Sequence, residues 1–199
     1  MGSRIMHLII AKHIAEKITV QDKNAFFIGG VAPDAVYPKG KSHFFIGHEK
    51  DYTTTVEFEK FLNKYPKTDY ILGYYTHLIA DYVWLKGFYQ GWLKNRMDVD
   101  DTLYKRYHGD FRLLNAKLLH HYQIDASILD SLNFDQVHDL DEVKVEDVKA
   151  FFPYVKEDMN YSKEDLEEEL QVFTFFQIVG YVETCIERGL LKLQEIGIK

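Results

Sequence analysis

The chain has 199 residues, which is enough for one domain with a sizeable hydrophobic core and short for two. Hydrophobic residues make up 46% and charged residues 28%, which excludes a largely disordered chain. The net charge of −7 gives no electrostatic support for a dedicated nucleic-acid patch or for binding to an anionic membrane. Nine histidines stand against one cysteine, Cys185, so an internal disulfide and a cysteine-rich zinc module are excluded. Any metal must therefore be held by His, Asp and Glu.

The distribution of apolar residues indicates a soluble protein. Residues 1–10 are not followed by a small-residue cleavage site before charges return at Lys12, so no signal peptide is predicted. The most apolar stretch, residues 71–85, is too short to span a bilayer and carries His77 and Asp81. A chain without disulfides fits the cytosol, and we expect a cytoplasmic protein without a transmembrane segment.

The N-terminal half shows helical spacing of apolar residues. We expect helices over residues 3–18, from 24 to about Gly29-Gly30, over 57–64 with Thr53 as a cap, and from Thr68 or Asp69 toward Leu93. Residues 30–52 are rich in Gly and Pro and form the longest predicted loop.

The C-terminal half continues this helical pattern. A helix is expected from Asp100 or Asp101 to about Tyr122, followed by three short helices between residues 126 and 159. Ser162, with Asp165 three residues later, predicts the start of a last long helix. No alternating strand pattern of useful length occurs, so we predict an all-α fold with a single multi-helix domain over residues 1–199.

His77 and Asp81 are four residues apart on the most apolar helix, so both side chains can reach one metal ion. The spacing alone is weak evidence, because about one His-x-x-x-Asp is expected by chance at this composition. His121 and Asp125 have the same spacing in a polar setting and need no such explanation. A carboxylate in an apolar helix is costly unless it is paired or binds a cation, which favours the central pair as ligands over a buried His with an acid partner.

Three further candidates lie upstream of this pair. Asp34 follows a Gly-Gly turn and His43 ends a loop rich in Lys and Gly, although an ordinary loop acid and a surface histidine would also explain them. His7 interrupts the apolar face of the first helix, where a core histidine bonded to a backbone carbonyl is the alternative. Together these residues offer nitrogen and oxygen donors suited to zinc, manganese or iron.

The order of these motifs resembles one known family. His7 in an N-terminal helix, Gly-Gly-Val-Ala-Pro-Asp ending at Asp34, Ser-His-Phe at 42–44 and Gly-Tyr-Tyr-Thr-His-Leu-Ile-Ala-Asp at 73–81 resemble the zinc-dependent phospholipase C family, which is related to the single-strand-specific zinc nucleases. The resemblance covers roughly the first 110 residues, and no part of the C-terminal third matches.

The resemblance implies an all-helical fold with up to three zinc ions at the mouth of a cleft. Asp34, His43, His77 and Asp81 would hold the best-defined ion, with Asp81 bridging to a neighbouring ion bound by His7. It further implies metal-assisted hydrolysis of a phosphoester, with Asp34 as the residue that orients or deprotonates the attacking water.

The chain also departs from the family pattern. It begins Met1-Gly2-Ser3 where the processed family members have an N-terminal Trp, and it has no His in residues 84–88, where the family has its next ligand. His108 and Asp110 are candidate neighbours of the site, but on a helix they point about 200° apart, and Arg112 stands where a Glu is expected. We therefore expect one zinc site and leave a second open, with manganese and iron as alternatives.

Substrate contacts are less defined than the ligands. Lys39, Lys41 and Lys50 could attract an anion or could be solvated loop lysines. An aromatic group could bind an apolar or base-like substrate part or could simply fill the core; its members are Tyr37, Phe44, Phe45, Tyr74 and Tyr75.

The predicted function is a metal-dependent phosphoester hydrolase acting on a small phosphoester, with phospholipid and nucleotide both open. One alternative is a nucleotide or nucleic-acid phosphohydrolase; the helical phosphohydrolases with adjacent His-Asp residues fit less well, because the one His-Asp dipeptide of the chain, His138-Asp139, lies far along the chain from the other candidate residues. Another is a non-catalytic helical protein that keeps one structural metal in a closed site. The oligomeric state is left open.

Overall fold

A computed structural model describes residues 2–199 and confirms the predicted all-α class. Within those residues, β-structure is limited to the two-residue strands β1 (Phe45–Ile46) and β2 (Thr55–Val56), which pair antiparallel with Phe45 opposite Val56. No helix in the described range combines the length and apolarity needed to cross a bilayer.

The α-helices are α1 (Arg4–Ala15), α2 (Lys23–Val31), α3 (Phe58–Lys64), α4 (Asp69–Trp84), α5 (Lys94–Met97), α6 (Leu103–His121), α7 (Ser127–Asp130), α8 (Val145–Glu157), α9 (Lys163–Glu167) and α10 (Phe175–Glu195). The 3₁₀ turns η1 (Ala32–Ala35) and η2 (Glu49–Asp51) and the π-helical segment η3 (Leu85–Leu93) complete the regular structure. The predicted helical course from Thr68 to Leu93 is therefore present, but its last nine residues are π-helical.

Polar caps define where the helices nearest the candidate residues begin. The Ser3 hydroxyl accepts a hydrogen bond from the Met6 N–H, and the Thr68 hydroxyl accepts one from Ile71, as expected for N-caps. Thr53 does not cap α3, whose N-cap is Glu57. Its hydroxyl instead accepts from the His48 N–H and donates to Asp51, so it closes the turn between β1 and β2.

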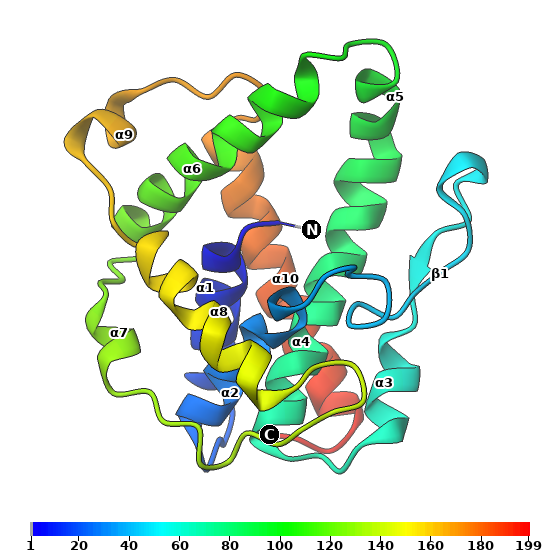
Figure 1. Ribbon diagram of the computed structural model, residues 1–199, viewed down its shortest axis with the longest axis vertical. Coiled ribbons are helices and arrows are strands. Elements are labelled where there is room, and N and C mark those ends of the chain that lie inside the picture. The colour runs from blue at the N-terminus through cyan, green and yellow to red at the C-terminus, as the bar shows by residue number, and fades with distance from the viewer. Residues whose placement is uncertain (1) are drawn as a thin grey trace.

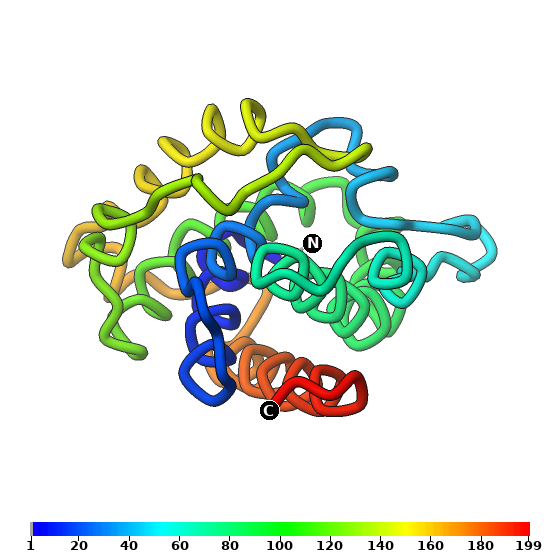
Figure 2. Tube along the Cα trace, turned by 90° about the horizontal axis from the view of Figure 1, so that it is seen from below, coloured from blue at the N-terminus to red at the C-terminus, as the bar shows by residue number. Residues whose placement is uncertain are grey.

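Helices α1, α2 and α4 form the centre of the fold and pack against one another (Figure 1). In the view of Figure 2, α10 lies along one side of these helices, and α8 lies on the opposite side. The central helices are lined with fully buried apolar side chains such as Ile9, Phe26, Tyr74 and Leu78. The candidate residues of α1 and α4 therefore lie inside the core.

Helices α2 and α4 cross with their backbones in direct contact. A Cβ atom at Gly73 would overlap the carbonyl oxygen of Phe26, and a Cβ atom at Gly29 would overlap that of Tyr70. Glycine is the residue that permits such close backbone approach. This crossing sets how near α2 and the turn that follows it lie to His77 and Asp81.

The end of the chain differs from the sequence prediction. Ser162 does form the predicted capping box with Asp165, but only the short helix α9 follows, and the long helix α10 begins at Phe175 with Thr174 as its N-cap. The buried Asp110 carboxylate accepts the backbone N–H groups of Gln171, Val172 and Phe173, which holds this stretch outside a helix. Likewise, the region predicted to form three short helices forms α7 and the 13-residue α8.

We predict that Gly73→Ala destabilises the fold by about 3 kcal/mol or more, because the new methyl group meets backbone and no flexible side chain can move aside. Urea denaturation of the metal-free protein measures the effect. The matched control is Gly180→Ala in α10, where a Cβ atom has open space. This control is expected to keep or slightly raise stability through helix propensity. Equal stability of the two variants would contradict the close crossing.

Candidate metal centre

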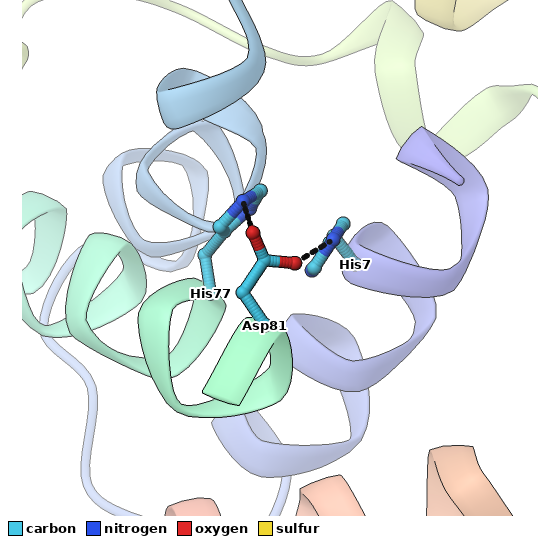
Figure 3. A group of neighbouring side chains, drawn as sticks. All are labelled: His7, His77 and Asp81. Atoms are coloured by element: carbon cyan, nitrogen blue, oxygen red, sulfur yellow. Dashed lines mark ion pairs between the residues drawn. The ribbon is translucent and has the colours of Figure 1, made fainter. Parts of the chain in front are cut away.

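Five of the residues predicted from the sequence come together in the core. His7 lies on α1, Asp34 in η1, His43 in the loop before β1, and His77 and Asp81 on α4. Two groups can each surround one ion, His7 with His77 and Asp81, and Asp34 with His43 and His77; within each group the ligand atoms lie within 4.8 Å of one another. Figure 3 shows His7 reaching from α1 toward the carboxylate of Asp81, next to His77 on the same helix as Asp81.

The contacts converge on the Asp81 carboxylate and on His43. His43 Nε2 lies 3.3 Å from Asp34 Oδ1, 3.4 Å from Asp81 Oδ2 and 3.3 Å from His77 Nε2. The other oxygen of Asp81 lies 3.4 Å from His7 Nε2, whose ring stacks on His77 with centroids 3.7 Å apart. One oxygen of Asp81 therefore faces the group with Asp34, and the other faces His7.

Backbone carbonyls fix the orientation of two of the imidazoles. His77 Nδ1 lies 2.9 Å from the Gly30 carbonyl oxygen, and His43 Nδ1 lies 3.1 Å from that of Lys39. A carbonyl only accepts, so each Nδ1 must carry the hydrogen and each Nε2 is left with a lone pair. Ser42 agrees with this assignment, because its hydroxyl donates to the same Lys39 carbonyl.

The result is a buried cluster of acceptors that face one another. The Nε2 lone pairs of His43 and His77 face carboxylate oxygens of Asp34 and Asp81 at distances of 3.3 to 3.8 Å. A cation placed among such acceptors would be stabilised by all of them. Two imidazole nitrogens and two carboxylates are also a donor set that zinc accepts, with each His held by a carbonyl behind it. The residues present therefore fit a divalent metal ion.

Burial and neighbouring charges shift the pKa values of His77 and Asp34. Burial, reinforced by His7, lowers the pKa of His77 well below the usual histidine range despite the nearby acids. Burial alone would raise the pKa of Asp34, but the adjacent His43 and the charge of Lys39 outweigh it and hold that pKa well below its usual range. At neutral pH, His77 is thus neutral and Asp34 is ionised, as metal binding requires.

A cavity of about 870 Å³ adjoins the cluster. Of the five clustered residues, Asp34 is the one among its described lining residues, although only 4% of the Asp34 side chain is exposed. The other four side chains are fully enclosed. A ligand in the cavity would therefore reach the cluster at Asp34.

The aromatic wall of this cavity differs from the predicted one. Tyr74 and Tyr75 are buried in the core, and Tyr37 is 92% exposed, away from the described cavity lining. Phe45 is the member of the predicted set that lines the cavity. The remaining aromatic lining comes from Tyr89, Tyr104, Tyr107, Phe111 and Phe151. No local motif marks these residues, because they come together only through the packing of η3, α6 and α8.

The two candidate neighbours of the site, His108 and Asp110, lie in different environments. His108 lines the cavity, whereas Asp110 is buried and accepts the three backbone N–H groups before α10. Helix α6 is continuous through Gly109, so the two side chains leave it in different directions. Arg112 pairs with Asp165 and Glu168 at the surface.

Sequence reasoning missed the backbone roles of two residues. Gly30 and Lys39 supply the carbonyls that orient His77 and His43, and the Lys39 side chain pairs with Asp34. Backbone acceptors carry no signature in the sequence. The short separation of Lys39 from Asp34 along the chain was the one signal in the sequence that these two side chains could pair.

We predict that the metal-free protein loses stability as the pH falls from 7 to 5. The unfolded chain protonates His77 near pH 6.5, whereas the folded state resists because its pKa is lowered. Below that pH the unfolded state binds more protons, so the free energy of unfolding falls with a slope of up to about 1.4 kcal/mol per pH unit for this group. Urea denaturation at a series of pH values measures the slope.

The variant His77→Gln removes this titratable group and is expected to flatten the dependence of the free energy of unfolding on pH over the same interval. His48→Gln, at an exposed loop position, serves as the control and should leave the slope unchanged. If both variants follow the parent profile, His77 does not have the lowered pKa.

Comparison with known proteins agrees with the site geometry. The family model for zinc dependent phospholipase C matches residues 6–95, a range that contains His7, Asp34, His43, His77 and Asp81. No curated protein and no solved structure matches the chain. His108 and Asp110 lie outside the matched range. Over residues 6–95, the resemblance to the zinc-dependent phospholipase C family is therefore confirmed.

Proposed function

We propose that the protein is a zinc-dependent phosphoester hydrolase. The observation that carries this proposal is the buried cluster of facing acceptors, which adjoins the cavity through Asp34. Asp34, His43, His77 and Asp81 would hold one zinc ion. The match to zinc-dependent phospholipase C supports zinc over manganese and iron, which the same donors also accept.

A second ion is a separate question. The Asp81 oxygen that faces His7 is not the one that faces His43, so one carboxylate could serve two ions. We propose one ion in the group with Asp34 and treat a second equivalent, bound through His7, as an outcome of the metal titration described below.

When bound, zinc would act as a Lewis acid toward a phosphoryl oxygen and lower the pKa of water in its coordination sphere. The chain's own contribution at the reacting end is Asp34. Its carboxylate is ionised and lies where the cluster meets the cavity, so it is positioned to orient a water molecule and accept its proton. His43 is held by the Lys39 carbonyl, and its Nε2 lies 3.3 Å from the Asp34 carboxylate.

The cavity separates this proposal from a purely structural metal. A structural site is closed by its protein ligands, whereas a catalytic site keeps a position open toward substrate. Here one ligand residue reaches a cavity of about 870 Å³ with aromatic and charged walls, large enough for a small phosphoester. Phospholipid and nucleotide substrates both present an apolar or aromatic part next to a phosphoryl group, and turnover of a panel of each distinguishes them.

Zinc binding is the first test. We predict at least one equivalent of tightly bound zinc in the wild-type protein, and a loss of affinity of at least tenfold in His77→Ala and in Asp81→Asn, because each change removes a ligand. Competition with a chromophoric chelator and elemental analysis measure affinity and stoichiometry. His7→Ala should affect only a second equivalent, if one binds.

The chain offers a matched control for these variants. His121 and Asp125 have the same spacing as His77 and Asp81, but both are exposed. His121→Ala and Asp125→Asn should therefore keep the wild-type zinc affinity. Wild-type protein that binds no zinc above background would reject the proposed function.

Activity tests the role of Asp34. We predict that Asp34→Asn lowers kcat for a soluble phosphodiester by about 10²–10⁴, the usual contribution of a positioned general base. The rates are compared at zinc concentrations that saturate both proteins, so that weaker metal binding is not mistaken for lost base catalysis. The control Asp101→Asn changes an exposed acid and should leave kcat unchanged. A zinc-saturated Asp34→Asn variant with wild-type kcat would exclude Asp34 as the base.

A further inference from the structure

The loop between η1 and α3 contains three lysines, and the structure separates them. Lys39 lines the cavity beside the cluster, and its ammonium pairs with Asp34. Lys41 lines a different groove, together with Glu57 and Lys60, and Lys50 is exposed in η2. Only Lys39 of the three brings a positive charge to the place where the cluster and the cavity meet.

The backbone of Lys39 is fixed by the same turn that orients His43. Its carbonyl oxygen accepts the His43 N–H at 2.9 Å and lies 3.1 Å from both His43 Nδ1 and the Ser42 hydroxyl. The Lys39 side chain is 44% exposed, so it reaches from this anchored turn into open space and to Asp34. The backbone bond of Lys39 to His43 thus holds the Lys39 ammonium close to Asp34.

The other cations of the cavity wall have partners outside the cluster. Arg4 pairs with Asp158 through two hydrogen bonds, of 2.6 and 3.1 Å, and Arg112 pairs with Asp165. Both guanidinium groups are therefore neutralised by acids of α9 or the end of α8. Lys39 differs, because its partner Asp34 is itself a proposed ligand of a divalent ion.

Metal binding changes the charge balance around Lys39. Asp34, as a ligand of a divalent ion, would no longer compensate the charge of Lys39. The ion also repels the ammonium and competes with it for Asp34. A phosphodiester group carries a single negative charge, so it matches this residual charge, and its non-bridging oxygens accept hydrogen bonds from an ammonium.

We propose that Lys39 is a substrate-binding residue whose ammonium binds a non-bridging oxygen of the phosphoryl group presented to the cluster. The inference rests on the proposed function and adds a residue from this chain to it. Lys39 exchanges its contact with Asp34 for the phosphoryl oxygen when the metal is bound. The same exchange leaves Asp34 free of the ammonium during proton transfer.

The test compares Lys39→Met, Lys39→Arg and the control Lys41→Met, with zinc content measured first in each. Calorimetric titration of the zinc-loaded proteins with inorganic phosphate should show affinity about 10- to 100-fold weaker in Lys39→Met, the usual effect of losing one charge-assisted hydrogen bond. Lys39→Arg should recover most of the affinity, and Lys41→Met should match the wild type. Zinc affinity of Lys39→Met should equal or exceed that of the wild type.

Kinetics distinguish the source of the phosphoryl group. A soluble phosphodiester and phosphatidylcholine vesicles are hydrolysed in parallel, and Lys39→Met should raise KM for whichever is a substrate more than it lowers kcat. A purely structural role predicts instead a lower melting temperature with phosphate affinity unchanged.

The two proposals fail in different ways. Zinc-loaded Lys39→Met that binds phosphate as well as the wild type overturns the role of Lys39 and leaves the metal site standing. Lower zinc affinity in Lys39→Met also overturns it, because the ammonium would then support the metal site. Wild-type protein without zinc overturns the proposed function and this inference together.

Discussion

The close crossing of α2 and α4 is the constraint on which the site depends. Gly29 and Gly73 allow the two backbones to touch, and any side chain at either position would force the helices apart. At this separation the Gly30 carbonyl lies 2.9 Å from His77 Nδ1. A wider crossing would remove this hydrogen bond and carry η1, with Asp34, away from α4. The packing of two glycines therefore sets the geometry of a polar cluster that neither glycine touches.

This arrangement explains why a group of buried polar residues is compatible with a stable core. Buried ionisable groups are costly when unpaired, and here the imidazoles of His43 and His77 are each held by a carbonyl on one side and face carboxylates on the other. This orientation turns the Nε2 lone pairs of His43 and His77 toward carboxylate oxygens, an arrangement that a cation would stabilise. Preorganising these side chains thus costs some folding stability, which metal binding would offset.

The sequence predicted which residues come together in the core better than it predicted the C-terminal half. The pairing of His77 with Asp81 could be predicted because helical spacing and apolar neighbours are local properties, and the order of Asp34 and His43 added the family resemblance. The start of the last helix could not be found from Ser162, because the outcome depends on Asp110, some sixty residues away, which binds the backbone of residues 171–173. The aromatic cavity wall was missed for the same reason, since Tyr107 and Phe151 meet only in the folded chain.

The clustered residues and most of the cavity wall come from different parts of the chain. The cluster and Lys39 lie within residues 6–95, which match the family model, whereas much of the cavity wall belongs to α6, α8 and α9. Asn115 is one residue of this C-terminal cavity wall. Its side-chain oxygen is buried without a hydrogen-bond partner among the described residues. The family match therefore covers the candidate metal ligands, whereas the C-terminal helices supply much of the cavity wall.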